Sequence, residues 1–224
     1  MYRLLLLLIC SPLFMSCSKN YKIVGTSSVS FLDGKMLFVK LMEGDRLVKI
    51  DSAEVVHGKF HMKGTLDTAC MALLYMDDRV IMPFVMENGK INISIDHIGM
   101  KVKGTPLNDS FNDFVVEQNM LNDKAYEVER LESRMIMDGR DYDDVQTEIF
   151  QQRKELSDKM NMLVKTFIGD NYDNVLGAGV FMLLCGDMQT PAANPLMREI
   201  LDEAPQSFLD IPCISRLAVT ADIN

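Results

Sequence analysis

The hydrophobic pattern of this sequence changes its period at one short segment, residues 104–109. Before it, short apolar runs alternate with polar residues; after it, apolar residues recur at spacings of three and four in long charged segments. Gly104 and Pro106 stop a strand, and Asn108 or Asp109 can accept hydrogen bonds from the first free N–H groups of a helix. We therefore predict an α+β protein, with a β-domain over residues 21–106 and helices over residues 107–224.

The residues before this segment predict about eight short strands. In the clearest one, Ile91, Ile93 and Ile95 alternate with polar residues, which is typical of a half-buried strand. His57-Gly58 predicts a tight two-residue connection, because glycine readily adopts a positive φ. Strands are expected at residues 22–25, 35–41, 46–56, 59–64, 70–76, 81–86 and 91–95. Short strands at such regular spacing predict an antiparallel β-sandwich or an open barrel.

The residues after the segment follow a helical period. One apolar stripe stops at Asp138-Gly139, and a second starts at Asp141 or Asp143 and ends before Gly169. Two long helices joined by a short turn pack antiparallel, so an αα-hairpin is expected. Further helices are expected over residues 174–185, 194–204 and 205–220.

The amino terminus predicts export and lipid attachment. Residues 1–16 combine Arg3, an apolar run and a small residue before Cys17, which is the pattern of a signal peptide. Its end resembles a bacterial lipobox, so Cys17 is predicted to be lipidated, with residues 17–20 as a tether to the membrane. A simple cleaved signal followed by an ordinary thiol at Cys17 is the alternative. Because residues 18–20 carry no acid, we expect a lipid-anchored protein of the cell envelope that faces the periplasm.

Acidic residues gather in the helical half of the chain. Residues 107–224 hold 22 acidic and 10 basic residues. Nucleic acid and anionic lipid would be repelled by this half, so neither is expected to bind it. Contact with the membrane is expected through the lipid on Cys17.

Three histidines and four aspartates are the candidates for metal ligands. His57 and His61 flank a tight turn, but neither they nor His97 have further ligands nearby in the sequence, and we interpret them as solvent-facing. The acidic cluster consists of Asp138, Asp141, Asp143 and Asp144. It lacks the spacing of a calcium-binding EF-hand and is better explained by helix capping and first-turn charge. No metal and no cofactor is expected.

The remaining cysteines, Cys70, Cys185 and Cys213, are far apart and form no C-x-x-C motif. In an exported chain two of them can form a disulfide. Because each lies in an apolar run, the favoured interpretation is a small buried residue.

Methionine is abundant, with 18 residues in the chain. Flexible thioethers suit adaptable binding surfaces, but Met36, Met62, Met86 and Met160 occupy core-periodic positions, so packing is the favoured role. No phosphate-binding loop and no Ser/His/Asp grouping is evident, so no catalytic residue is predicted.

Several segments together resemble a known family. They are residues 50–53, 58–64, 85–91, 104–109, 173–177 and 205–209. In order and spacing they resemble the uncharacterised amino-terminal domain, with its helical connector, that precedes a thioredoxin-like module in envelope lipoproteins of the thiol:disulfide interchange and AhpC/TSA type. The resemblance covers residues 21–220 and implies the fold and the envelope location. It does not imply redox catalysis here, because a W-C-x-x-C sequence is missing and the chain contains no Trp.

Two functions are compatible with these observations. In the first, a lipid-anchored envelope protein acts as a non-catalytic binding or scaffolding module of unknown ligand. Its partner would be another envelope protein, such as a thioredoxin-like one, or a second copy of itself. In the alternative, the chain is a shortened or split thiol:disulfide oxidoreductase or peroxiredoxin-like protein whose redox module is missing or supplied in trans. The sequence favours the first, in which the protein is not an enzyme.

Overall fold

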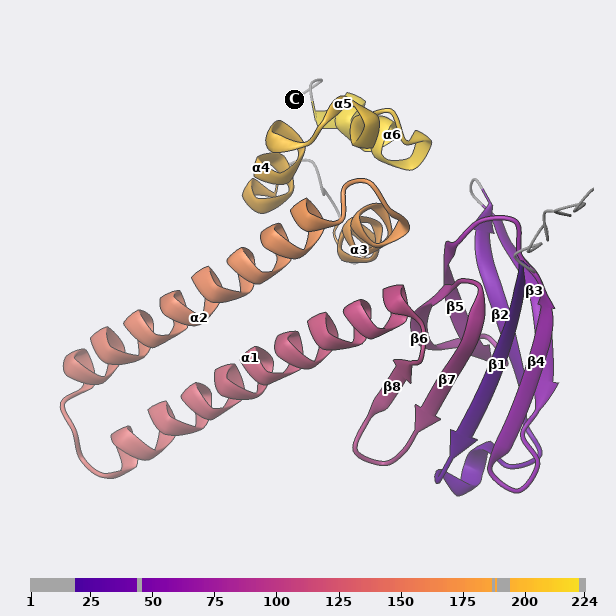
Figure 1. Ribbon diagram of the computed structural model, residues 1–224. Coiled ribbons are helices and arrows are strands. Elements are labelled where there is room, and N and C mark those ends of the chain that lie inside the picture. The colour runs from indigo at the N-terminus through magenta and orange to yellow at the C-terminus, as the bar shows by residue number, and fades with distance from the viewer. Residues whose placement is uncertain (1–18, 44–45, 187, 189–193, 222–224) are drawn as a thin grey trace, which may run out of the picture.

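A computed structural model describes residues 19–43, 46–186, 188 and 194–221. A β-sandwich comes first along the chain and helices follow it (Figure 1), which confirms the predicted α+β order. The predicted signal peptide and the predicted lipidation site, Cys17, lie outside the described residues. Asn20, which was expected in the tether, is the first residue of strand β1.

The described strands form two four-stranded sheets. The first has the order β4-β1-β7-β8 and the second the order β3-β2-β5-β6. All neighbours are antiparallel except β1 and β7, which run parallel. The bounds are β1 Asn20–Ser27, β2 Met36–Glu43, β3 Arg46–Glu54, β4 Lys59–Thr65, β5 Cys70–Met76, β6 Arg79–Met86, β7 Gly89–Ile95 and β8 Met100–Lys103. A sandwich or an open barrel was expected. Because the two sheets are separate, the structure is a sandwich.

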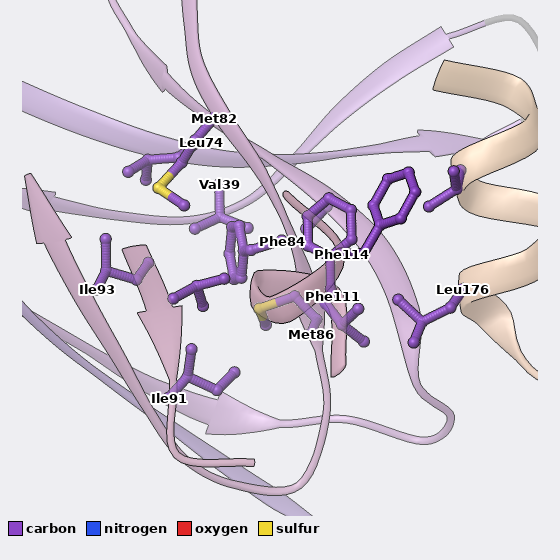
Figure 2. Packing of buried hydrophobic residues seen from close by; sticks show 14 of the residues in the cluster. Val39, Leu74, Met82, Phe84, Met86, Ile91, Ile93, Phe111, Phe114 and Leu176 are labelled. Atoms are coloured by element: carbon purple, nitrogen blue, oxygen red, sulfur yellow. The ribbon is translucent and has the colours of Figure 1, made fainter. Parts of the chain in front are cut away.

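Alternation along the strands builds the core between the sheets. Ile91 and Ile93 of β7 are at most 1% exposed. They belong to the same buried cluster as Val39 and Phe84 of the second sheet (Figure 2). The polar residue between the two isoleucines, Asn92, is only partly buried, as expected for a half-buried strand.

The predicted connection at His57-Gly58 joins the two sheets. β3 belongs to the second sheet and β4 to the first, and Val56 and Lys59 form a single bridge across the turn. The φ angles are +50° at His57 and +68° at Gly58, the tight-turn geometry in which glycine is favoured.

Helices α1 (Pro106–Met137) and α2 (Tyr142–Asp170) form the predicted αα-hairpin. α1 ends just before Gly139, whose φ is +76°. Asp141 caps α2, because its carboxylate accepts the backbone N–H groups of Asp143 at 3.0 Å and Asp144 at 3.2 Å. The distal part of the hairpin has a small core of its own, formed by Val128, Met135, Val145 and Ile149.

The remaining described α-helices are α3 (Val175–Gly186), α4 (Pro195–Glu203), α5 (Gln206–Leu209) and α6 (Pro212–Ala221). The single helix expected over residues 205–220 is therefore wrong, because Pro212 starts a new helix, a position that proline tolerates. α3 packs closely on β5: a Cβ added at Gly179 would lie 2.7 Å from the Met71 side chain. Among the described residues, no helix is both long and apolar enough to cross a membrane.

The methionines predicted to be in the core divide into two groups. Met62 and Met86 are 3% and 0% exposed, and Met160 packs partly buried against the main core. The assignment of Met36 to the core is wrong, since its side chain is 40% exposed. Leu37 and Val39 face the core from β2, so alternation turns Met36 outward.

Candidate functional site

A buried amide joins the start of α1 to strand β6. Asn108 is 0% exposed. Its Oδ1 accepts the N–H of Val85 at 2.9 Å, and its Nδ2 donates to the carbonyl oxygen of Val85 at 2.7 Å. These are the two bonds that a neighbouring strand would make, so the side chain occupies the edge of β6 at this residue. The same Nδ2 donates to Thr105 Oγ1 at 2.9 Å.

The cap of α1 comes from the sandwich. The Glu87 carboxyl group, 9% exposed, accepts the backbone N–H of Asn108 at 3.0 Å. Asp109 instead accepts the N–H of Gly104, which precedes the helix, at 2.9 Å. The prediction that Asn108 or Asp109 caps α1 is therefore wrong, because β6 uses the Asn108 amide and a residue from the turn after β6 satisfies the helix start.

An apolar cleft of about 680 Å³ lies beside this junction. β6 and β8 are edge strands of the two sheets, and residues of β6, β8, α1 and α3 line the cleft. Figure 2 shows Phe111 and Phe114 of α1 in the same buried cluster as Phe84 and Met86 of β6. The lining also includes Pro83, Met100, Val115, Leu184 and Met188. Its volume and apolar walls are typical of a ligand-binding pocket.

The polar groups of the cleft are side-chain amides from one helix. Asn112, Gln118 and Asn119 of α1 contribute them, and no Asp, Glu, Lys, Arg or His is found among the described lining residues. Asn112 is 6% exposed, and its amide makes one long contact, 3.4 Å, to Asp113 Oδ1. Such a lining favours a mainly apolar ligand with a few hydrogen-bonding groups and offers no acid or base for catalysis.

The edge of β6 is unsuited to pairing with a further strand. Pro83 has no N–H to donate, and the pairing of β6 with β5 shifts register between Leu74 and Tyr75. Asn108 already fills the edge at Val85. A ligand in the cleft must therefore be held by side-chain contacts rather than by extending the sheet.

The predicted histidine and thiol candidates are not assembled into a site. His57, His61 and His97 are exposed. In the part of the chain that the structure describes, no group of three or more His, Cys, Asp or Glu is arranged to hold a metal ion.

The acidic cluster serves the helix ends. Asp141 caps α2, and Asp143 and Asp144 lie in its first turn, which confirms the capping interpretation for these three. Asp138 differs, because it is the C-cap residue of α1.

The described thiols are not bonded to one another: Cys70, Cys185 and Cys213 are all free. Cys185 is buried, as predicted, whereas Cys70 and Cys213 are only partly buried. Burial raises the pKa of the Cys185 thiol to about 11 and raises the pKa of the Cys70 thiol. A nucleophilic cysteine needs the opposite shift.

A match to a known family covers the sandwich and the first residues of α1. A family model described as a domain of unknown function, DUF4369, matches residues 21–111. The match therefore includes Glu87, Asn108 and the first six residues of α1, Pro106 to Phe111. It confirms the resemblance to an uncharacterised domain over these residues; the predicted extent to residue 220 and the thioredoxin-like setting stay predictions. We found no curated protein that matches the chain.

Proposed function

We propose that this chain is a non-catalytic binding module of the cell envelope whose cleft beside β6 takes up an apolar peptide segment of a partner protein. The observation that carries the proposal is the cleft itself, about 680 Å³ in volume with no charged residue in its described lining. The partner is another envelope protein, and a thioredoxin-like one is a candidate from the family resemblance.

The three amides of the lining support a peptide over an acyl chain. Asn112, Gln118 and Asn119 can each donate and accept hydrogen bonds. A peptide segment presents backbone N–H and C=O groups that need such partners when they leave water, whereas an acyl chain has none. Apolar peptide side chains would fill the space between Phe114, Val115 and Leu184.

A neutral apolar fluorophore, N-phenyl-1-naphthylamine, provides the first test. Val115→Glu places a carboxylate in the cleft and should weaken fluorophore binding by about tenfold or more. Val116→Glu is the matched control, because Val116 is 44% exposed on the same helix and does not line the cleft. Equal affinities for the two variants would show that the fluorophore does not bind in the cleft and would refute the proposed site.

Displacement of the fluorophore then identifies the class of ligand. Short apolar peptides should displace it, and Gln118→Ala should weaken peptide binding several-fold but fluorophore binding much less, because a peptide backbone offers several donors and acceptors to the amide and the fluorophore offers one N–H. Displacement by fatty acids but by no apolar peptide would replace the proposed ligand with an acyl chain.

The lipid anchor is part of the same proposal. Fatty-acid labelling of the chain in its host should depend on Cys17, and processing should be sensitive to globomycin. A Cys17→Ser variant that still incorporates label, or an unlabelled mature protein, would refute the anchor. The redox alternative gains no support from the thiols, because burial raises the pKa of two of them.

A further inference from the structure

The hairpin of α1 and α2 extends away from the sandwich (Figure 1), and one of its faces carries two matching stripes. On α1 the stripe is Met120, Lys124, Glu127 and Leu131. On α2 it is Gln152, Glu155, Lys159 and Met162. Within each stripe the spacing is three or four residues, which places its members on one side of the helix.

Bonds between the two helices fix which residues lie opposite one another. Glu132 of α1 accepts a hydrogen bond from Gln146 Nε2 at 2.8 Å and a second from the guanidinium of Arg153. Position 132 is therefore level with residues 146–153 of the antiparallel helix. Eight residues further back, Lys124 is level with residues 154–161, a range that contains Lys159.

The same count pairs each residue of the α1 stripe with one residue of the α2 stripe. Each such pair is called a level, and four levels follow one another from the sandwich toward the tip of the hairpin. They are Met120 with Met162, Lys124 with Lys159, Glu127 with Glu155, and Leu131 with Gln152. The lysine and glutamate levels also border a groove of about 300 Å³ in the hairpin. Val128, Leu131 and Leu156 supply the apolar lining of this groove.

Within one copy, residues at the same level on the two helices carry like charges, and the apolar level nearest the sandwich stays exposed. Two lysines are level with each other, and so are two glutamates, and the described ion pairs include none of the four. Glu155 accepts a hydrogen bond from the side-chain amide of Gln151 at 3.1 Å, and its charge also interacts with that of its neighbour Lys154. The two methionines of the first level, Met120 and Met162, are 54% and 64% exposed.

We propose that two copies of this chain dock through this face, antiparallel, about a two-fold axis between the lysine level and the glutamate level. The rotation reverses the order of the levels. The lysines of each copy then lie over the glutamates of the other, and the two methionines of each lie over the Leu131 level and the groove of the other. The result is a four-helix bundle with an isologous interface.

A second copy fits this face because the face is complementary to itself. Each level meets its complement at the level that the rotation brings over it. Lysines lie over glutamates, and the flexible methionines lie over the end of the groove where Leu131 belongs to its apolar lining. The levels follow one another by about one helical turn, roughly 5.4 Å, so all four can be in contact at once.

Charge reversal tests this arrangement on the chain as purified from its host, with mass measured by sedimentation velocity and light scattering. One variant carries Lys124→Glu and Lys159→Glu, and the other carries Glu127→Lys and Glu155→Lys. Each should dimerise about 100-fold more weakly than the wild type, because every attraction across the axis becomes a repulsion. An equimolar mixture of the two should restore a dimer, since one face is then all negative and the other all positive.

Glu129→Lys is the matched control, because it makes the same change at an exposed residue two positions from Glu127, on another side of the helix. It should dimerise like the wild type, and circular dichroism should show that all variants keep their helices. A monomeric wild type would overturn the proposal. So would variants that still dimerise alone, or a mixture that fails to associate. None of these results bears on fluorophore binding in the cleft, so the two proposals can fail separately.

Discussion

Replacing Asn108 with alanine should lower the free energy of unfolding by about 3 to 5 kcal/mol. The side chain is 0% exposed, and its loss leaves three buried groups without partners: the N–H and C=O of Val85 and the hydroxyl of Thr105. Each such group costs about 1 to 3 kcal/mol, and relaxation around the new space keeps the sum near the low end. Urea unfolding followed by circular dichroism measures the loss.

Asn112→Ala is the matched control for this prediction. Asn112 lies one turn later on α1 and is 6% exposed, but its amide makes only the 3.4 Å contact to Asp113. Its replacement should cost about 1 kcal/mol or less. If the two alanine variants lose equal stability, the Asn108 amide does not hold α1 to β6.

Asn108→Asp adds a test with a definite sign in pH. The introduced carboxyl would be buried beside Glu87 and the Val85 carbonyl oxygen, so its pKa in the folded state should be raised above the unfolded value. The folded state then binds more protons than the unfolded state between these two pKa values, and stability falls as the pH rises through that range. The loss relative to the wild type should be largest at neutral pH and shrink toward acid; a loss independent of pH would refute the buried environment.

Three further predictions concern local features. Cys185 should be alkylated at pH 8 on the order of a hundredfold more slowly than an exposed thiol, since burial raises its pKa to about 11. Mass spectrometry should show the alkylation rate increasing as the pH approaches that value. Fast labelling at pH 8 would contradict the burial of this thiol. Asp141→Ala should destabilise α2 by about 1 kcal/mol, because its carboxylate caps the helix; Asp143→Ala, which removes no cap, should cost less in the same urea titration. Gly25→Ala should cost about 1 to 3 kcal/mol, since the new Cβ would lie 2.0 Å from the ring of Phe60; an unchanged midpoint of unfolding would show that the ring can move aside.

Features encoded by neighbouring residues could be predicted from the sequence. The change of period at residues 104–109 marks the boundary between strands and helices, and α1 does begin there, at Pro106. Asp141 caps α2 through residues two and three positions away, so its role follows from local spacing. The alternation of isoleucines with polar residues likewise predicts the strand that ends at Ile95.

Features that depend on distant residues could not be predicted. Glu87 and Asn108 are 21 residues apart. Glu87 follows β6, and two more strands, β7 and β8, lie between it and α1, so no local pattern indicates that its carboxyl group caps this helix. The parallel pairing of β1 with β7 is equally non-local, because antiparallel neighbours are the default for short strands joined by tight turns. The cleft is non-local as well, because its walls come from two edge strands of different sheets and from two helices.

Helix α1 carries both proposed surfaces without an interruption. After Pro106 it contains no Gly or Pro up to Met137, so the cleft wall at Val115 and the stripe that starts at Met120 belong to one continuous helix. Asn108 attaches the first turn of this helix to β6. Residues of both α1 and β6 line the cleft. The stripe needs only α1 and α2, which have a small core of their own.

Asn108→Ala should therefore separate the two surfaces. Under conditions in which the variant stays folded, its affinity for N-phenyl-1-naphthylamine should fall several-fold, because the wall formed by α1 is no longer held against β6. Its dimer dissociation constant should stay within about twofold of the wild-type value, because the residues of the stripe are untouched. If the variant instead loses dimerisation and keeps the cleft affinity, the dimer interface involves the junction with the sandwich, and the hairpin face cannot be sufficient for association.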